Sequence, residues 1–288
     1  MKKNRIILLF FFALILIIPF QVSHAETIQV CLFDCQYRSL KEAVEVASSG
    51  DIIRLKEGNY LENVYINKDL IIKGKTKKAV KIKGYTSHDP ALRVGPSNVE
   101  VRLENITVSG GSKGLFATGE SKVVLRECEI SRNKIGIYAD GMAEVRMFNT
   151  SVRRNRLDKI NGAGLEIDDS ATVIIRDSRI LHNSEGIKVG GFSRLEVYNS
   201  AITGNIGTGL LAEESPNIYL QNNEFIGSYV YGVALILGEC GFREIGETFT
   251  GTIAGKNNRF KETGIKPYCP VELSFLTTNQ GDEYNNNK

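Results

Sequence analysis

Arginine and aromatic residues recur on short segments in which polar and apolar residues alternate. A guanidinium group can bind a carboxylate through two parallel hydrogen bonds, and a flat aromatic ring can pack on the apolar face of a sugar. Because they alternate with apolar residues, we expect the following side chains to share one outward surface: Arg102, Arg126, Arg146, Phe148, Arg176, Arg194, Tyr198 and Tyr219. Such a surface could bind an acidic saccharide. The alternative is a solvated face on which opposite charges pair across neighbouring strands, each pair contributing under about 1 kcal/mol.

Acidic residues in the turns before these segments offer a second kind of chemistry. Asp168 and Asp169 are adjacent, and together with Arg146 or Arg176 they come nearest to a calcium site with a basic residue beside it. These four residues are the catalytic candidates, although Asp is also common in turns for local reasons. Calcium enters only with this interpretation, and the sequence otherwise implies no cofactor and no metal site.

A repeat of about 22 residues must position these side chains. One phrase recurs with steps of 22, 22, 28, 22 and 23 residues, beginning at Leu103, Leu125, Met147, Ile175, Val197 and Leu220. A second phrase, Gly followed by Leu, Ile or Val, keeps the same spacing from Gly114 to Gly232. A fixed period in this range indicates stacked units, none of which can bury its apolar face alone. Within each unit apolar and polar residues alternate, which predicts strands rather than helices.

The repeats and one further column of residues resemble the right-handed parallel β-helix proteins of the pectin-lyase-like superfamily. That column follows the second strand of each unit and contains Asn133, Asn155, Asn183 and Asn205. The superfamily has an asparagine ladder at this bend, where Asn tolerates the left-handed backbone conformation and can bond to its equivalent one coil away. Gly111, at the same place in the first repeat, would also tolerate a positive φ.

The resemblance implies an all-β, right-handed parallel β-helix of about nine coils with an N-terminal capping helix. It also implies that a ligand lies along the outer face of the first strand of each coil. No specific enzyme family is matched, because the Gly-His-Gly segment of polygalacturonases and the Gln and Asp-Phe signatures of pectin methylesterases are absent.

The first 25 residues have the pattern of a secretory signal peptide. Basic residues open the chain, an apolar run from Ile6 to Ile18 follows, and Ser23 and Ala25 suit the −3 and −1 positions of a cleavage site. We expect a secreted or periplasmic protein with no membrane span after cleavage. The chain has 36 basic and 33 acidic residues, and three of the basic ones lie in the signal, so the remainder is balanced. Nothing therefore favours nucleic-acid binding, and we expect a monomer.

Export makes the cysteines interpretable as disulfides. Four of them allow three pairings, and we expect Cys31 with Cys35 and Cys240 with Cys269, one bridge at each end of the fold. Cys128 falls in an inward column of small residues, so we expect a buried free thiol there.

The chain therefore divides into four parts. Residues 1–25 are the signal, 26–50 hold a strand, the cysteine loop and the capping helix, 51–276 form the β-helix, and 277–288 are a polar tail that we expect to fray. The helix is predicted because Ser39 and Glu42 form a capping box ahead of apolar residues at helical spacing.

Three functions are compatible with this sequence. The one we favour is an exported, non-catalytic β-helix that binds a polysaccharide or another cell-envelope component along the first-strand face. The alternatives are a polysaccharide lyase or related uronate-acting enzyme, and a purely structural envelope protein.

Overall fold

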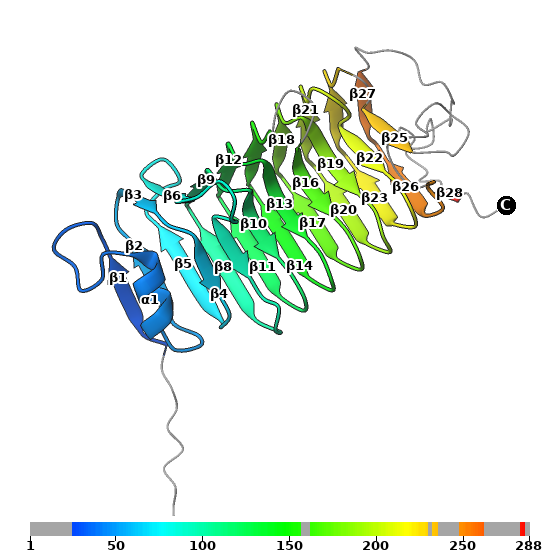
Figure 1. Ribbon diagram of the computed structural model, residues 1–288. Coiled ribbons are helices and arrows are strands. Elements are labelled where there is room, and N and C mark those ends of the chain that lie inside the picture. Colours follow the sequence, from blue (N-terminus) through cyan, green and yellow to red (C-terminus); the bar gives the residue numbers. More distant parts are fainter. Residues whose placement is uncertain (1–24, 157–161, 230–231, 236–247, 262–282, 286–288) are drawn as a thin grey trace, which may run out of the picture.

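The computed structural model describes residues 25–156, 162–229, 232–235, 248–261 and 283–285. Over these residues the chain winds into the expected parallel β-helix of about nine coils, with three sheets running along its length (Figure 1). The fold prediction is therefore confirmed. No helix in this part of the chain is long and apolar enough to cross a membrane.

Each sheet stacks the equivalent strands of successive coils. The first sheet contains, in hydrogen-bonded order, β1 (Thr27–Val30), β2 (Ile52–Leu55), β5 (Leu70–Gly74), β8 (Glu100–Glu104), β11 (Lys122–Arg126), β14 (Glu144–Phe148), β17 (Thr172–Arg176), β20 (Arg194–Tyr198), β23 (Asn217–Gln221), β26 (Thr252–Lys256) and β28 (Glu283–Asn285). The second sheet contains β3 (Gly58–Leu61), β6 (Val80–Lys83), β9 (Thr107–Ser109), β12 (Glu129–Ser131), β15 (Ser151–Arg153), β18 (Arg179–Leu181), β21 (Ala201–Thr203), β24 (Glu224–Ile226) and β27 (Arg259–Lys261). The third sheet contains β4 (Val64–Ile66), β7 (Leu92–Val94), β10 (Lys113–Ala117), β13 (Ile135–Ala139), β16 (Ala163–Ile167), β19 (Glu185–Val189), β22 (Leu210–Ala212) and β25 (Val233–Leu235).

The strands pair in the register that the repeat predicts. Val123 lies between Val101 of the preceding coil and Val145 of the following coil, and all three are buried. Alternation along each strand sends one set of side chains into the core and the other to the surface. Because like residues stack on like, a single apolar core extends from Val30 to Ile253.

Helix α1 (Leu40–Val46) covers the N-terminal end of this core, as predicted (Figure 1). The Ser39 side chain accepts a hydrogen bond from the Glu42 amide at 3.0 Å. The Glu62 carboxylate accepts from the first two amides of the helix at 2.8 Å, and Lys68 donates to a carbonyl at its C-terminal end at 2.8 Å. The coil beneath the helix thus satisfies groups at both of its ends, which a short helix cannot do by itself.

The far end of the β-helix departs from the expectation of a frayed tail. Strands β26 and β27 form the last coil, and Glu283–Asn285 then pair antiparallel with β26 as strand β28. An added strand covers the open edge of the first sheet, which would otherwise invite pairing with another chain. Cys240 and Cys269, for which a second disulfide was expected, lie outside the described residues.

The two predictions for the other cysteines are confirmed. Cys31 and Cys35 form a disulfide, and Cys128 is free and buried. Burial raises the pKa of the Cys128 thiol to about 12, so the thiolate needed for reaction is scarce at neutral pH.

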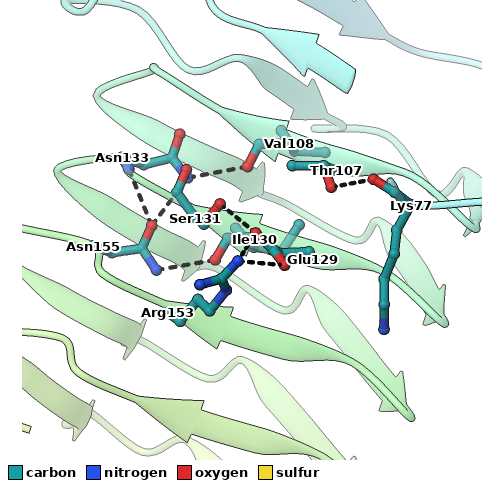
Figure 2. Close-up of polar contacts among 9 residues, drawn as sticks. All are labelled: Lys77, Thr107, Val108, Glu129, Ile130, Ser131, Asn133, Arg153 and Asn155. Atoms are coloured by element: carbon teal, nitrogen blue, oxygen red, sulfur yellow. Dashed lines mark hydrogen bonds and ion pairs between the residues drawn. The ribbon is translucent and has the colours of Figure 1, made fainter. Parts of the chain in front are cut away.

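The asparagines at the second bend form a buried ladder. Nδ2 of Asn133 donates to Oδ1 of Asn155 at 3.0 Å (Figure 2), Asn155 donates to Asn183 at 3.0 Å, and Asn183 donates to Asn205 at 3.2 Å. The same oxygens accept from the backbone amides one coil earlier. At its N-terminal end, the amide of Gly111 donates to Asn133.

The left-handed residue at this bend is not the asparagine, and that part of the expectation was wrong. Positive φ values of 56° to 78° belong to the residue before each ladder position, namely Gly110, Arg132, Arg154, His182 and Gly204. The preceding residue makes the sharp turn, which leaves the asparagine side chain pointing inward. Asparagine is thus required for its side-chain amide rather than for its backbone.

A second ladder, which we did not anticipate, joins the coils at the first bend. The Thr150 amide donates to the Ser178 hydroxyl at 3.1 Å, the Ser178 amide donates to Ser200 at 3.1 Å, and the Ser200 amide donates to Asn223 at 2.9 Å. The small polar residues in this inward column satisfy buried backbone amides that have no strand partner.

Replacing Asn183 with Ala is expected to lower the free energy of unfolding by about 1–3 kcal/mol, because two buried donors of Asn155 lose their acceptor. Urea unfolding followed by circular dichroism measures the change. Asn217, exposed on β23, provides the matched control, and Asn217→Ala is expected to change little. Equal stability of the two variants would contradict a stabilising role for the ladder.

Candidate functional site

The outer face of the first sheet carries the predicted ligand-binding residues in three columns. Arg194 lies in the column at the start of the strands, and Arg102, Arg146 and Tyr219 lie in the middle column. The remaining residues lie in the column nearest the first bend. We call this the end column, and it contains Arg54, Lys73, Glu104, Arg126, Phe148, Arg176, Tyr198 and Gln221.

Two arginines of the end column stack on aromatic rings of the next coil. The guanidinium carbon of Arg126 lies 4.4 Å from the ring centre of Phe148, and that of Arg176 lies 4.2 Å from the ring centre of Tyr198. Both arginines are exposed, and neither forms an ion pair with any described residue. Each stack contributes about 0.5–1 kcal/mol at such a site. It restricts the motion of the guanidinium group without using a carboxylate partner.

The other three predicted arginines are already paired. Arg102 lies 3.8 Å from Glu100, Arg146 pairs with Glu144, and Arg194 pairs with Glu196. In each case the partner is two residues away on the same strand. These three arginines therefore belong to a solvated charged face, which was the alternative to a binding surface. Their ion pairs run along a strand, whereas the alternative had placed them across neighbouring strands. Cross-strand pairs occur elsewhere, for example between Arg153 and Glu129 on the second sheet at 2.9 Å (Figure 2).

The two tyrosines of the first-sheet face lie beside each other, with ring centres 5.8 Å apart. The Tyr198 hydroxyl donates to Glu196 at 2.9 Å, and burial together with this carboxylate raises the pKa of Tyr198. Burial alone would raise the pKa of Glu196, but hydrogen bonds from Arg194 and Tyr198 outweigh it and the pKa is lowered. Tyr198 is therefore held by the hydrogen bond to Glu196 and by the Arg176 guanidinium group that lies over its ring.

The acidic catalytic candidates accept hydrogen bonds from backbone amides, one in the same turn and one in the equivalent turn of the preceding coil. Oδ2 of Asp169 accepts from the Gly141 amide at 3.1 Å, and Oδ1 of Asp168 accepts from the Asp169 amide at 2.8 Å. Asp168 and Asp169 line a cavity of about 510 Å³, and the other described residues that line it include Phe192 and Glu214 but no Arg or Lys.

The arginine candidates do not converge on these carboxylates. Arg176 ends strand β17, whereas Asp168 and Asp169 precede its first residue, so about 13 Å of strand separates the groups. Arg146 is paired with Glu144. Within the described residues, no group of three or more His, Cys, Asp or Glu side chains could hold a metal ion. The described donors therefore do not converge into the calcium site that was considered from the sequence.

The third sheet carries an outward column that the sequence reasoning missed. Tyr65, Arg93, Phe116 and Tyr138 lie on successive strands. The rings of Phe116 and Tyr138 are 5.3 Å apart, Arg93 lies 5.2 Å from the Phe116 ring centre, and Lys113 lies 4.8 Å from that of Tyr138. Phe116 and Tyr138 each follow a glycine of the second repeated phrase by two residues. The second repeated phrase could therefore have predicted this outward column as well as the register of the strands.

The same column continues into a half-buried charged cluster. Glu166 and Lys188 lie on the next two strands, and Lys188 pairs with Glu213 at 2.6 Å. Burial raises the pKa of Glu166, and burial raises the pKa of the nearby Glu185 to about 7, although that carboxylate accepts a hydrogen bond from the Thr208 amide. Of the third-sheet cations, Lys188 thus pairs with a carboxylate, whereas Arg93 and Lys113 lie over aromatic rings.

Substituting Glu185 with Gln is expected to change stability in a pH-dependent way. The folded-state pKa of about 7 exceeds the ordinary value of 4.5, so the folded protein holds this proton longer than the unfolded chain. Stability from this group is complete below about pH 4.5 and is lost as pH rises through about 7. The free energy of unfolding of the variant should therefore be higher than that of the original protein by on the order of 2 kcal/mol at pH 8, and the two values should be equal near pH 4.5. Urea unfolding across this range measures the difference, and Glu120→Gln, at an exposed turn, is the control. A difference that does not vary with pH would contradict the assignment.

Comparisons with known proteins give the family of this fold. A family model described as "right handed beta helix region" matches residues 69–225 and 141–287. None of the curated proteins matches the chain.

Solved structures share the architecture at low sequence identity. An alginate lyase from Paenibacillus sp. str. FPU-7 superposes with a TM-score of 0.63 at 16% identity, covering 84% of this chain and 89% of the lyase. Pectate lyase Pel9A gives 0.64 at 12% identity, covering 88% and 80%, and a pectin methylesterase from carrot gives 0.52 at 13% identity, covering 87% and 86%. Identities this low establish a common fold alone. Together with the stacked coils and the family match over most of the chain, they show that this protein belongs to the right-handed β-helix family.

Proposed function

We propose that this protein is an exported, non-catalytic β-helix that binds an acidic polysaccharide along the end column of the first sheet. The observation that carries the proposal is the alternation of free arginines and aromatic rings in that column. Arg126 and Arg176 form no ion pair with a described residue, and the guanidinium group of each lies over an aromatic ring of the next coil.

The spacing of these groups suits an extended chain of sugars that runs along the β-helix axis. Arg126 and Arg176 are two strands apart, which corresponds to about 9.6 Å. A carboxylate on one sugar could bind Arg126 and a carboxylate further along could bind Arg176, while Phe148 and Tyr198 offer ring faces beside them. Because stacking already limits the motion of both arginines, less side-chain entropy is lost on binding.

Two further observations support the ligand class and the absence of catalysis. The structures that share the fold include lyases named for pectate and alginate, both of which are acidic polysaccharides. The catalytic candidates of this chain are divided between two places, since Asp168 and Asp169 bind turn amides and Arg176 lies at the far end of its strand. This arrangement favours binding over elimination.

Export is supported by two independent features. The first 25 residues have the pattern of a signal peptide. The Cys31–Cys35 disulfide is of the kind that persists in oxidising compartments outside the cytoplasm.

Arg176→Ala is expected to weaken polysaccharide binding about tenfold, equivalent to about 1.4 kcal/mol, because a preorganised charged contact is lost. Affinity electrophoresis in gels containing polygalacturonate, alginate or neutral dextran provides the measurement. The original protein should be retarded by an acidic polymer but not by dextran, and less so as salt rises. Tyr198→Ala should also weaken binding of the acidic polysaccharide.

Arg179→Ala is the matched control, because it removes the same charge from an exposed position on the second sheet. It should leave retardation unchanged within about twofold. No retardation by any acidic polymer would contradict the proposal and leave a structural envelope protein as the better explanation. Release of unsaturated uronates during the assay would instead favour a lyase.

A further inference from the structure

A cavity of about 690 Å³ lies at the N-terminal end of the first sheet, just beyond the ends of strands β1, β2 and β5. Residues of three successive coils line it, because Val30, Leu55 and Gly74 are aligned in the sheet and the chain enters the first bend after each. The disulfide-closed loop from Cys31 to Cys35 forms its outer wall.

The cavity combines an apolar wall with a cationic rim. Leu32, Phe33 and Leu55 supply the apolar surface, and Phe33 is unusual in being 77% exposed although it lines a concave site. Arg54, Lys56 and Lys75 are exposed on the rim, and none forms an ion pair with a described residue.

One further cation and one acid complete the lining. Lys73 is held by Glu104 at 3.1 Å, and Glu57 is the single acidic residue among the described residues that line the cavity. The cavity therefore has excess positive charge beside an exposed aromatic ring, which is complementary to an anionic ligand with an apolar face.

The cavity is continuous with the end column. Arg54 and Lys73 belong to both, and the column leads from Lys73 through Glu104 to Arg126 in unbroken strand register. A chain lying along the column toward the N-terminal end would reach this cavity. Beyond it the disulfide loop stands in the way.

We propose that this cavity is a terminal subsite that receives the end unit of the acidic polysaccharide, with its carboxylate on Arg54, Lys56 or Lys75 and its ring against Phe33. The inference rests on the proposed function and adds chain-end recognition to it. Short oligomers would bind here preferentially, whereas long polymers would depend mainly on the end column.

The test compares a trimer with a polymer by isothermal titration calorimetry, using trigalacturonate and polygalacturonate or the corresponding mannuronates. Phe33→Ala and the double variant Lys56→Gln with Lys75→Gln change exposed side chains, so both should fold normally by circular dichroism. Each should weaken trimer binding about tenfold and polymer binding by less than about twofold.

Matched controls exist for both changes. Phe192 is 78% exposed on a turn outside the cavity, and Lys81 and Lys83 are two exposed lysines on the second sheet. Phe192→Ala and the double variant Lys81→Gln with Lys83→Gln should leave trimer affinity unchanged.

The outcomes separate this inference from the function on which it rests. If the original protein bound no acidic polymer, the proposed function and the terminal subsite would both be contradicted. If the polymer bound through Arg176 but the cavity variants kept full trimer affinity, the terminal subsite alone would be overturned. Equal losses for trimer and polymer would place the cavity under an internal part of the chain and also overturn it. Binding of anionic phosphatidylglycerol vesicles through the same residues, without trimer binding, would assign the cavity to lipid instead.

Discussion

Each bend of the β-helix turns the backbone away from its strand partners, and the buried amides there need acceptors from the neighbouring coil. Two inward columns supply them. At the second bend the asparagines from Asn133 to Asn205 donate and accept in sequence, and at the first bend the hydroxyl and amide oxygens from Thr150 to Asn223 accept from the backbone. A shift of one residue in one of these coils would leave donors unsatisfied in both columns. The ladders therefore fix the register of the coils that they join, and the outward columns of those coils inherit that register.

The fixed register gives the outer surface its chemistry. Strands about 4.8 Å apart bring residues of successive repeats within contact distance, so Arg126 meets Phe148 and Arg176 meets Tyr198. Whether an arginine is available to a ligand then depends on its neighbours along the strand. Arg146 and Arg194 have a glutamate two residues away and pair with it, whereas Arg126 and Arg176 have none and remain free. Arginines without an ion pair and arginines in ion pairs thus lie on the same face of the first sheet.

More of the fold than of the candidate site could be predicted from the sequence. The period of 22 residues and the alternation within it predicted the sheets and their register, because stacking of identical columns is a direct consequence of the repeat. The capping helix was also predictable, since its N-cap and apolar spacing are local. The site was harder, because the pairing of Arg102 with Glu100 or of Asp169 with the Gly141 amide depends on side-chain rotamers and turn geometry. The left-handed residue before each asparagine was misplaced for the same reason. The cavity behind the Cys31–Cys35 loop depends on how an irregular segment folds over three coils, which no periodic pattern encodes.

A crystal structure of the protein with a bound uronate hexamer would test the central claim most directly. The expected complex has the sugar chain along the end column, with carboxylates on Arg126 and Arg176 and rings facing Phe148 and Tyr198. An ordered hexamer along the third sheet, over Phe116 and Tyr138, or over the paired arginines of the middle column, would contradict it.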